Sequence, residues 1–451
     1  MSTPEVSDAT LPAAKLNAEN AYTPRERKVV LTFAIIGALI ESMELNLLSY
    51  PLRDLSNSFD VSTQAVVTVI TLQSIASIAG GFIFGWTADK WGRRPTYVAF
   101  TTIYGTLAIL GAFLTNFELF TITRIVAGIA MGGAFGVIFA MFTETWKTKN
   151  RGLMGSVLQG MFICGTLITQ AILFATITSF GSNNGWRTGF VIIGAMSVGI
   201  GVVAFRSLPE SKLWRAARDA DTAPSPQQTH VDESDERTAT PVPPPTEHRT
   251  RVIFGGLILT LATTGIFAAS YCYITFGPTY LREYAGLSLG WSTIVLSIGT
   301  LLGIASYITF GALSDRIGRR GSTFWSCAVG VLGFGLFLAI GSDTETPQGT
   351  GDTWTVATAA LAGAAIGYAG FGVIGTWISE FYPTRYRALG SGATYYVARG
   401  VGSGLFPLFA LMAADGNVHR AMGFGIIGAI VGMIGCLFVP DTRDKVITTG
   451  S

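Results

Sequence analysis

The sequence predicts an all-α membrane protein with twelve transmembrane helices in two pseudo-symmetric six-helix bundles. Apolar residues make up 49% of the 451 residues and charged residues only 13%, about half the charged share of a typical soluble domain. The apolar residues gather in long segments, and a helix needs about 20 such residues to cross a bilayer. The second half of the chain also repeats motifs of the first half.

The twelve apolar segments divide evenly around a polar middle. They lie at 29–50, 64–88, 96–114, 119–142, 153–178, 187–206, 251–277, 289–313, 322–341, 355–378, 388–412 and 421–439. This division predicts an N-terminal bundle over 29–206 and a C-terminal bundle over 251–439. Polar tails precede and follow the bundles at 1–28 and 440–451, and no signal-peptide cleavage site follows the first apolar run.

The polar middle of the chain, residues 207–250, connects the two bundles. Its greater part, 215–250, reads RAARDADTAPSPQQTHVDESDERTATPVPPPTEHRT. A segment this rich in proline and charge cannot bury an apolar core. We therefore expect a largely disordered linker.

The distribution of Lys and Arg predicts the orientation. With an even number of spans, the two tails and the linker share one side of the membrane. Two arginines lie within spans, Arg124 and Arg399, and only four basic residues fall on the opposite side: Arg53, Arg187, Arg282 and Arg420. The positive-inside rule then places both termini in the cytoplasm. We expect a multi-pass protein of the bacterial cytoplasmic (inner) membrane.

Composition and motifs argue against several function classes. The four cysteines lie in apolar segments, which implies neither disulfides nor a metal site, and the three histidines lie in loops. The net charge of +2 gives no sign of a nucleic-acid partner. The sequence has no Walker loop, HExxH or GxSxG motif, and GFGVIG (370–375) follows no predicted strand. An ATP-driven pump or an intramembrane enzyme is therefore not expected.

Three motifs of the first half recur in the second. The pairs are GWTADKWGRR (85–94) with GALSDRIGRR (311–320), ETWKTKNR (144–151) with EFYPTRYR (380–387), and LPES (208–211) with VPDT (439–442). The Glu-to-Arg spacing is the same in both members of the second pair. A repeat of this kind in a protein with many spans predicts a transporter built from pseudo-symmetric halves.

These motifs resemble those of the major facilitator superfamily over essentially the whole chain. The segment 85–94 is similar to the signature loop between that superfamily's second and third helices. The segment RIVAGIAMGG (124–133) resembles its motif B, and LPES resembles the sugar-porter branch and its organic-acid relatives. The glycines of 128–136 are of the kind that lets helices approach closely.

Within the superfamily, the sequence resembles the metabolite:proton symporters of sialate and aromatic acids. Those proteins carry Asp-Gly-x-Asp in the first helix, where this chain has Glu41 and Glu44 at the same spacing. GGAFG (132–136) and ETW (144–146) are similar to further elements of that branch. Glutamate replaces aspartate at both positions, and Ser42 replaces the glycine.

Glu41 and Glu44 share one face of the first span. A carboxylate in hydrocarbon costs about 3 kcal/mol or more, so such residues are functional candidates by default. We expect Glu44 to bind the coupled proton and Arg124 to hold its charged form, with Glu41 as a second proton site or a substrate contact. Two alternatives remain open: both glutamates are neutral and hydrogen-bonded, or Arg124 and Glu44 form a structural ion pair.

Arg399, deep in the eleventh span, is the expected clamp for a substrate carboxylate, because a guanidinium suits a carboxylate's geometry. The alternative is a pair between Arg399 and Glu41 in the empty state. Aromatic and amide side chains are further candidates for lining a cavity: Tyr271, Tyr273, Trp377, Tyr395, Tyr396, Gln73, Gln159 and Gln170.

Charged residues at the cytoplasmic ends of the helices are the expected gate. Asp89 and Asp315 end the second and eighth spans, where each can meet the positive N-terminal end of a helix in its own half, at the fifth and eleventh spans. By resemblance to the family's loop networks, two charge pairs accompany them, with Arg94 and Arg320 beside them. The pairs are Arg93 with Glu144 and Arg319 with Glu380.

The most favoured function is proton-coupled uptake of a small organic carboxylate by alternating access. The energy source is the proton gradient, no cofactor is needed, and the protein is expected to act as a monomer in the lipid bilayer. A proton-driven drug exporter and a sugar or polyol:proton symporter of the same fold are the alternatives. A buried arginine argues against the first of them, because exporters of cationic drugs do better without a buried cation.

Overall fold

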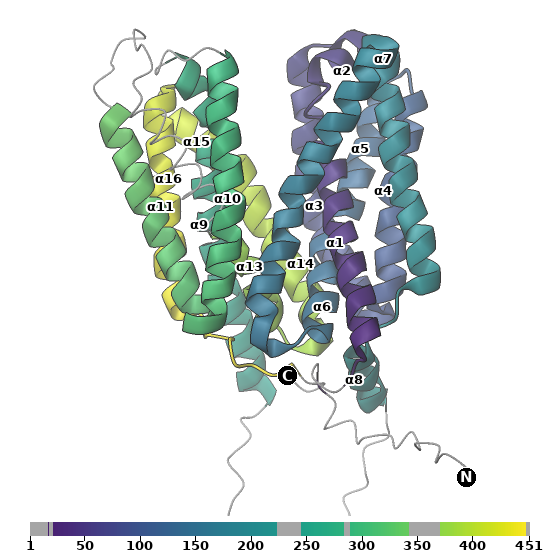
Figure 1. Cartoon of the computed structure of the whole chain (residues 1–451), viewed down its shortest axis with the longest axis vertical. Helices are drawn as coiled ribbons and strands as arrows, with labels where there is room; N and C mark the ends of the chain where they lie inside the picture. The colour runs from purple at the N-terminus through teal and green to yellow at the C-terminus, as the bar shows by residue number, and fades with distance from the viewer. Residues whose placement is uncertain (1–16, 18–20, 223–244, 284–288, 342–369, 448–451) are drawn as a thin grey trace, which may run out of the picture.

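The computed structural model describes residues 17, 21–222, 245–283, 289–341 and 370–447, and helices dominate them (Figure 1). The first half contains α1 (Pro24–Asn46), α2 (Leu52–Phe59), α3 (Thr63–Trp91), α4 (Arg93–Phe113), α5 (Phe117–Met131), α6 (Ala134–Thr145), η2 (Thr148–Asn150), α7 (Arg151–Ser207) and α8 (Lys212–Thr222). The second half contains α9 (Pro245–Glu283), α10 (Leu289–Ile317), α11 (Arg319–Gly341), α13 (Phe371–Phe381), η3 (Thr384–Tyr386), α14 (Arg387–Arg399), η4 (Gly400–Leu405), α15 (Phe406–Ala413), α16 (Val418–Gly435) and η5 (Cys436–Phe438).

Eight helical segments of the described chain are long and apolar enough to cross a membrane. One of them, Thr148–Ser207, holds both the fifth and the sixth predicted spans, because α7 continues through a break at Gly181. Gly181 has φ +76° and ψ 169°, a conformation that glycine adopts without strain. The predicted eighth and ninth spans correspond to α10 and α11. Of the predicted tenth span, 355–378, the part before residue 370 lies outside the described residues.

The helices pack as two bundles, one from each half of the chain (Figure 1). In the first bundle α7 packs against α1 and α4, and α3 packs against α5. In the second, α16 packs against α9 and α11. The bundles meet mainly where α3 contacts α14 and where α7 contacts α10. These two contacts are equivalent under the internal repeat, so the seam between the bundles is itself pseudo-symmetric.

Both ends of the described chain lie at one end of the molecule, which we call the termini end. There Tyr22, Leu213 and Ile447 belong to one small apolar cluster. The ribbons of the bundles converge toward this end and diverge toward the opposite one (Figure 1). Glycines permit the close approach: a Cβ added to Gly136 would clash with the carbonyl oxygen of Ala388 across the seam. Backbone therefore packs directly on backbone here.

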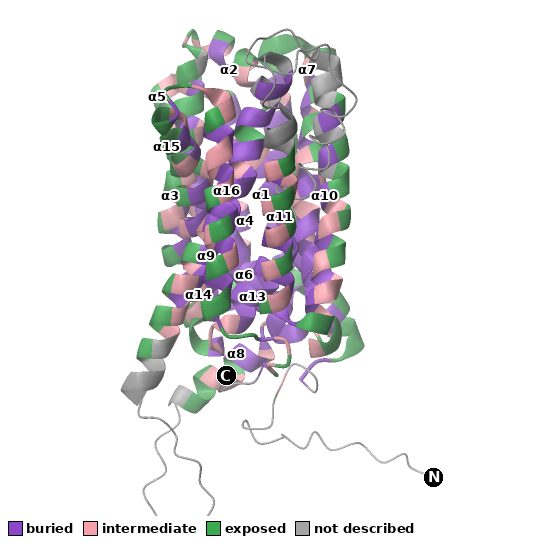
Figure 2. Cartoon of the chain, turned by 90° about the vertical axis from the view of Figure 1, so that its left-hand side faces the viewer, coloured by how far each residue is buried: buried purple, intermediate pink, exposed green. Residues whose placement is uncertain are grey.

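The helices are exposed on their outer faces and buried on their inner faces (Figure 2), and many of the exposed side chains are large and apolar. Among the most exposed large side chains are Phe113, Leu257, Leu332 and Met412. Apolar patches of this extent are unusual on a protein that faces water. They suit a protein whose solvent is lipid, because lipid tails are as apolar as a leucine side chain.

Helices extend into both ends of the predicted linker, and the C-terminal tail packs against the rest of the chain. Part of the segment expected to be disordered forms α8, and α9 already begins at Pro245. The start of α8 is held because Leu213 and Trp214 are buried and the Ser211 hydroxyl accepts a hydrogen bond from the Trp214 N–H at 3.2 Å. The tail packs through Ile447, which is fully buried. In the sequence, the signal for this packing is the presence of isolated apolar residues, Leu213, Trp214 and Ile447, in otherwise polar stretches.

Candidate functional site

A cluster of buried charges joins the two bundles at the termini end. Arg93, at the start of α4, lies 2.9 Å from Glu144 of α6 and 2.9 Å from Asp89 of α3. Arg387 of α14, from the other half, lies 3.1 Å from the same Glu144 carboxylate. The structure thus contains the Arg93–Glu144 pair that the resemblance implied, and it adds a cation from across the seam.

A second cluster repeats this arrangement in the other half. Arg319 lies 2.7 Å from Asp315 and 3.0 Å from Glu380, and Arg151 of the first half lies 3.2 Å from Glu380. Sequence reasoning missed Arg151 and Arg387 as members of these clusters. Their equal spacing from a glutamate in the two repeated motifs was the signal that could have identified them.

The two aspartates cap helices of the opposite half, which corrects the expectation that each meets a helix of its own half. Asp89 accepts hydrogen bonds from the first backbone N–H groups of α14, including that of Leu389 at 2.8 Å. Asp315 accepts from Gly152 and Leu153 of α7, at 2.8 and 2.9 Å. Each carboxylate meets the positive end of a helix dipole. The physical reason is that α3 and α10 lie at the seam, next to helices of the other bundle.

Arg94 and Arg320 were expected to lie beside the charge pairs of the gate, but they contribute to the network in another way. Their backbone N–H groups, rather than their guanidinium groups, enter the network: Glu210 accepts from Arg94 at 3.2 Å, and Asp441 accepts from Arg320 at 3.2 Å. The Arg94 guanidinium donates to the Phe205 carbonyl instead. Burial raises the pKa of the Glu210 carboxyl, while hydrogen bonds from backbone N–H groups lower it. LPES and VPDT thus supply equivalent caps for α4 and α11.

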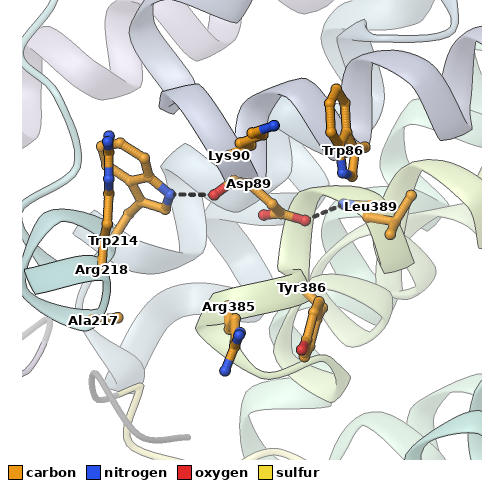
Figure 3. A pocket seen from close by; sticks show the side chains of 9 residues that line it. All are labelled: Trp86, Asp89, Lys90, Trp214, Ala217, Arg218, Arg385, Tyr386 and Leu389. Atoms are coloured by element: carbon orange, nitrogen blue, oxygen red, sulfur yellow. Dashed lines mark hydrogen bonds between the residues drawn. The ribbon is translucent and has the colours of Figure 1, made fainter. Parts of the chain in front are cut away.

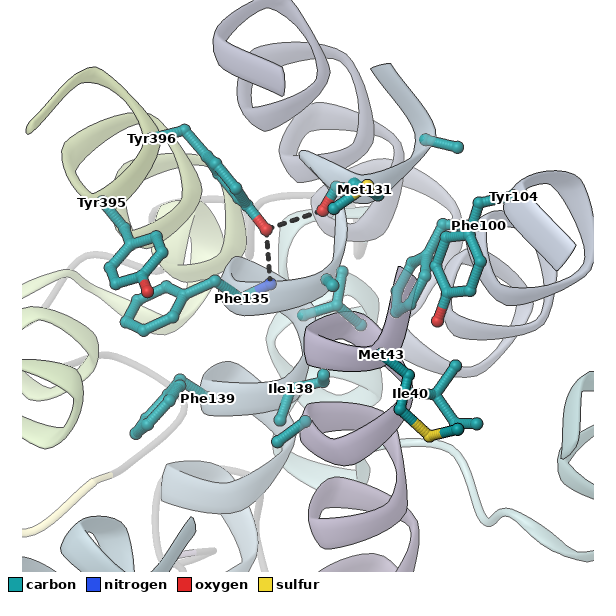
Figure 4. Close-up of a cluster of buried hydrophobic side chains, with 14 of the residues drawn as sticks. Ile40, Met43, Phe100, Tyr104, Met131, Phe135, Ile138, Phe139, Tyr395 and Tyr396 are labelled. Carbon is teal, nitrogen blue, oxygen red and sulfur yellow. Dashed lines mark hydrogen bonds between the residues drawn. The ribbon is translucent and has the colours of Figure 1, made fainter. Parts of the chain in front are cut away.

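Glu41 lies in a second region, at the seam beyond the charge clusters. It is 2% exposed, and its Oε1 atom lies 2.7 Å from the Tyr396 hydroxyl oxygen. The same hydroxyl lies 2.6 Å from the Met131 carbonyl oxygen and accepts from the Phe135 N–H at 3.4 Å (Figure 4). Glu41 and Met131 belong to the first half and Tyr396 to the second. This group therefore connects the bundles through one phenol oxygen.

Arg399 lies close to Glu41, at the end of α14. It is 6% exposed, and the Glu41 carboxyl lies near enough to affect its charge, as do the phenols of Tyr271, Tyr395 and Tyr396. Its Nη1 atom is buried without a hydrogen-bond partner in the described part of the chain. The backbone becomes a π-helix at the next residue, and the Ser403 hydroxyl donates to the Arg399 carbonyl at 2.6 Å. Such π-turns occur frequently at functional sites.

Three tyrosines lie near this arginine, Tyr271, Tyr395 and Tyr396, and they contact further aromatic rings. Tyr395 stacks on Phe135 across the seam, with ring centroids 3.6 Å apart and planes 7° apart. Gln159 is a hydrogen-bond partner of Tyr395. Phe267 meets Tyr395 edge-on at 5.3 Å and lies 6.1 Å from Tyr271. We call Glu41, Arg399 and these aromatic and amide side chains, together with Tyr396, the central cluster.

Trp377 does not belong to the central cluster, which corrects the sequence-based expectation. Its indole N–H donates to the Pro440 carbonyl at 3.1 Å, and its side chain is 1% exposed. It lies one turn before Glu380 on α13, at the termini end. The segment after η5 folds back over this end of the bundle, and the indole anchors it there. An aromatic residue in a span says little about depth, which explains the error.

Glu44 and Arg124 lie together inside the first bundle. Glu44 accepts a hydrogen bond from the Ser197 hydroxyl at 3.2 Å. The Arg124 guanidinium lies between the rings of Phe120 and Phe190, 5.8 and 5.6 Å from their centroids. Its three nitrogens have no hydrogen-bond partner in the described residues, and it interacts with Glu44 through its charge alone. The expected proximity is present, without a direct hydrogen bond.

Comparisons with known proteins agree with this architecture. A family model described as the Major Facilitator Superfamily matches residues 33–407. The chain is 25% identical over 422 residues to a cis,cis-muconate transport protein of Acinetobacter baylyi, covering 92% of this chain and 95% of that protein. It is 23% identical over 428 residues to a sialic acid transporter of Escherichia coli, covering 90% and 96%.

A solved structure shares the fold. The proton:xylose symporter XylE, bound to 6-bromo-6-deoxy-D-glucose, matches with a TM-score of 0.72 at 18% identity, covering 94% of this chain and 98% of that chain. This likeness confirms the predicted fold class, an all-α membrane protein of two pseudo-symmetric bundles. At this level of identity it says nothing about the substrate.

Proposed function

Because the chain belongs to the Major Facilitator Superfamily, whose members are membrane transporters, we propose that it takes up a small organic carboxylate together with protons. It is an integral membrane protein and not an enzyme. The relatives named as muconate and sialic acid transporters support an organic acid as the substrate. The excess of Lys and Arg at the termini end supports placing that end in the cytoplasm of a bacterium. The proposal involves one chain, no cofactor, and the proton gradient as energy source.

Arg399 carries the proposal. A buried guanidinium is costly unless an anion neutralises it, and this one keeps a hydrogen-bond donor without a partner. A substrate carboxylate can accept from the planar fork in a bidentate way, which a lysine could not provide. Tyr395 and Tyr271 lie near the guanidinium, so the adjacent part of the substrate can meet an apolar, polarisable surface.

Glu44 is the proposed site of proton coupling, with Arg124 favouring its ionised form. Glu41 is the second proton site, for a reason of hydrogen-bond geometry. The Tyr396 hydroxyl has a single proton, yet Glu41 and the Met131 carbonyl both lie within 2.7 Å of it. All three atoms are satisfied when a protonated Glu41 donates to Tyr396 and Tyr396 donates to Met131. We infer that Glu41 is protonated in this conformation.

The charge clusters act as the gate in this proposal. They tie the bundles together at the termini end by ion pairs and helix caps that cross the seam. With that end in the cytoplasm, the conformation described here is closed to the cytoplasm. Rocking of one bundle against the other must break these contacts to release substrate and protons inside.

The decisive experiment measures binding of carboxylates and of their methyl esters, for wild type, Arg399→Lys and Arg399→Ala. Wild type should prefer the acid. Arg399→Lys should weaken binding of the acid by about tenfold and Arg399→Ala by about a hundredfold or more, since charge-assisted bonds are worth roughly 1.5–3 kcal/mol each. Arg187→Ala, which removes a partly exposed guanidinium bound to the Ala112 and Leu114 carbonyls at the end of α4, serves as the control.

Two outcomes would overturn the carboxylate proposal. One is a wild type that binds the ester as well as the acid. The other is a folded Arg399→Ala protein that still prefers the acid. Either would favour the sugar or polyol carrier, which the likeness of LPES to the sugar-porter branch supports. Uptake driven by a proton gradient in sealed vesicles tests the coupling separately.

A further inference from the structure

The sequence places few charged side chains within its spans. Away from the ends of the twelve predicted spans it has four: Glu41, Glu44, Arg124 and Arg399. These two acids and two cations balance each other when both acids are ionised. A buried charge is costly unless an opposite charge neutralises it. The protonation of the two glutamates therefore sets how much negative charge a substrate can bring into the centre of the protein.

Arg124 already has a counterion in Glu44. Both side chains are buried, and the charge of Arg124 acts on the Glu44 carboxyl. The guanidinium lies between the rings of Phe120 and Phe190. All four residues belong to the first bundle. A substrate that binds between the bundles therefore does not replace Glu44 as the partner of this cation.

The cations of the gate lie too far away to serve a substrate in the central cluster. In the gate, two arginines share each glutamate: Arg93 and Arg387 at Glu144, Arg151 and Arg319 at Glu380. At the same end, Lys90, Arg385 and Asp89 line one pocket (Figure 3). The length of α14, about 18 Å at 1.5 Å per residue, separates Arg387 at its start from Arg399 at its end.

Arg399 is therefore the cation that a substrate in the central cluster can meet. Its Nη1 atom is buried without a hydrogen-bond partner among the described residues. The groups that act on its charge are three phenols and the Glu41 carboxyl. With Glu41 protonated, as inferred above for this conformation, the central cluster carries one positive charge. With Glu41 ionised, it would carry none.

We propose that the transported acid carries a single negative charge. This inference rests on the proposed function and narrows the substrate to monocarboxylates and to diacids whose second carboxyl is protonated or esterified. One ionised carboxylate neutralises Arg399. A second would be buried among phenols, an amide and aromatic rings, and the sequence supplies no further cation within the spans to balance it. An unpaired buried charge of this kind weakens binding by about a hundredfold or more.

The test measures binding of two series of probes to the purified full-length protein by calorimetry. The probes are adipic acid and terephthalic acid, each as the diacid, the monomethyl ester and the dimethyl ester. At neutral pH these forms are a dianion, a monoanion and a neutral molecule. Each half-ester should bind about a hundredfold more tightly than its diacid. As the pH falls toward the second pKa of the diacid, the two affinities should converge, because the diacid becomes a monoanion.

A second cation in the central cluster should reverse this preference. Gln159 is buried and is a hydrogen-bond partner of Tyr395, so Gln159→Lys adds an ammonium at that position. The affinity for the diacid, relative to that for the half-ester, should rise by about tenfold or more, as expected for one charge-assisted hydrogen bond. Gln64→Lys is the matched control, because Gln64 is exposed near the start of α3, and it should leave the ratio unchanged.

The outcomes separate the single charge from the proposed function. A diacid that binds wild type as tightly as its half-ester at neutral pH overturns the single charge and leaves the carboxylate proposal standing. A folded Gln159→Lys protein with an unchanged ratio also overturns the single charge. Half-esters that do not bind, or that bind no better than their diesters, overturn the proposed function itself. The comparison in wild type decides the matter even if Gln159→Lys does not fold.

Discussion

Away from the charge clusters, two further buried glutamate–arginine pairs of the described chain differ in how they relate to the seam. Glu44 and Arg124 both belong to the first bundle. Glu41 belongs to the first bundle and Arg399 to the second. The first pair is enclosed by apolar and aromatic side chains of its own bundle. The second is surrounded by residues of both bundles, and the Tyr396 hydroxyl of the second bundle contacts Glu41 and Met131 of the first.

This difference assigns the pairs different parts in a rocking mechanism. Rigid-body motion of one bundle against the other leaves a pair within a bundle unchanged, but it must alter a pair that crosses the seam. The central cluster can therefore respond directly to conformation and substrate. The Glu44–Arg124 pair can respond only if helices shift inside the first bundle. Mutations in the Glu44–Arg124 pair and mutations in the central cluster should therefore affect transport in different ways.

The largest effect is expected at Glu44. Glu44→Gln keeps the size and the hydrogen bond with Ser197 but cannot take up or release a proton. Accumulation driven by a proton gradient should be abolished, while exchange of labelled for unlabelled substrate should persist. Both are measured in proteoliposomes. Glu41→Gln is the comparison and should impair binding as well as coupling. Gradient-driven accumulation by Glu44→Gln would falsify its role as coupling site.

The next effect is expected at the caps that cross the seam. Asp89→Asn loses the charge that meets the α14 helix dipole and Arg93, so the closed termini end should become less populated. Transport should slow by about tenfold, at roughly 1–2 kcal/mol for a favourable, partly buried dipole contact. Substrate affinity should stay within a few-fold of wild type. Asp315→Asn should slow transport to a similar extent, because the Asp315 carboxylate makes the equivalent contact with α7.

Distances between spin labels at the two ends of the molecule report the conformational shift. Asp54→Asn is the matched control, because the Asp54 carboxylate accepts from Ser182 within the first bundle. It should leave the distance distribution unchanged. A folded Asp89→Asn protein that loses binding without any change in distances would contradict a role in gating.

Much of the fold and part of the site follow from sequence patterns. Segment length and repeated motifs were sufficient for the two bundles, because a bilayer demands long apolar helices. Charged side chains are costly in hydrocarbon, so Glu41, Glu44, Arg124 and Arg399 could be singled out as candidates from the sequence. The structure brings Glu41 close to Arg399 and Glu44 close to Arg124.

The helix caps, the position of Trp377 and the role of Tyr396 depend on which helices pack against each other. Short sequence motifs do not reveal this packing. A repeat shows that Asp89 and Asp315 are equivalent, but not that each caps a helix of the other half. The depth of Trp377 depends on where α13 ends, and its partner is the carbonyl of Pro440. The role of Tyr396 depends on a contact between residues 355 positions apart.

A smaller effect is expected at Tyr396, the hydroxyl that links Glu41 to the first bundle. Tyr396→Phe leaves the Glu41 carboxyl and the Met131 carbonyl without this partner, at a cost of about 1–3 kcal/mol for a buried unsatisfied group. Thermal stability should fall, and substrate affinity should fall by several-fold. Tyr104→Phe is the matched control within the first bundle, because the Tyr104 hydroxyl has no hydrogen-bond partner in the described residues. Equal losses in both variants would contradict a specific link across the seam.

The smallest effect concerns the C-terminal tail, which also crosses the seam. Lys445 Nζ donates to the Glu380 carbonyl at 2.9 Å, and Arg151 of the first half donates to the Lys445 carbonyl at 3.3 Å. Burial, with the nearby charges of Arg387 and Arg151, lowers the pKa of Lys445 to about 8. The released tail keeps the ordinary value of about 10.4 and so holds its proton more tightly than the docked tail.

Docking of the tail should therefore become more favourable as the pH rises from about 8 to about 10, because the docked lysine loses its proton first. A spin label at the exposed Asp444 position should become less mobile over that range. Lys445→Met should remove the pH dependence, since a methionine buries the same length of chain without charge. Lys212→Met removes an exposed ammonium that pairs with Glu26 and should leave the dependence intact. A label that gains mobility with rising pH would contradict this sign and the docked geometry behind it.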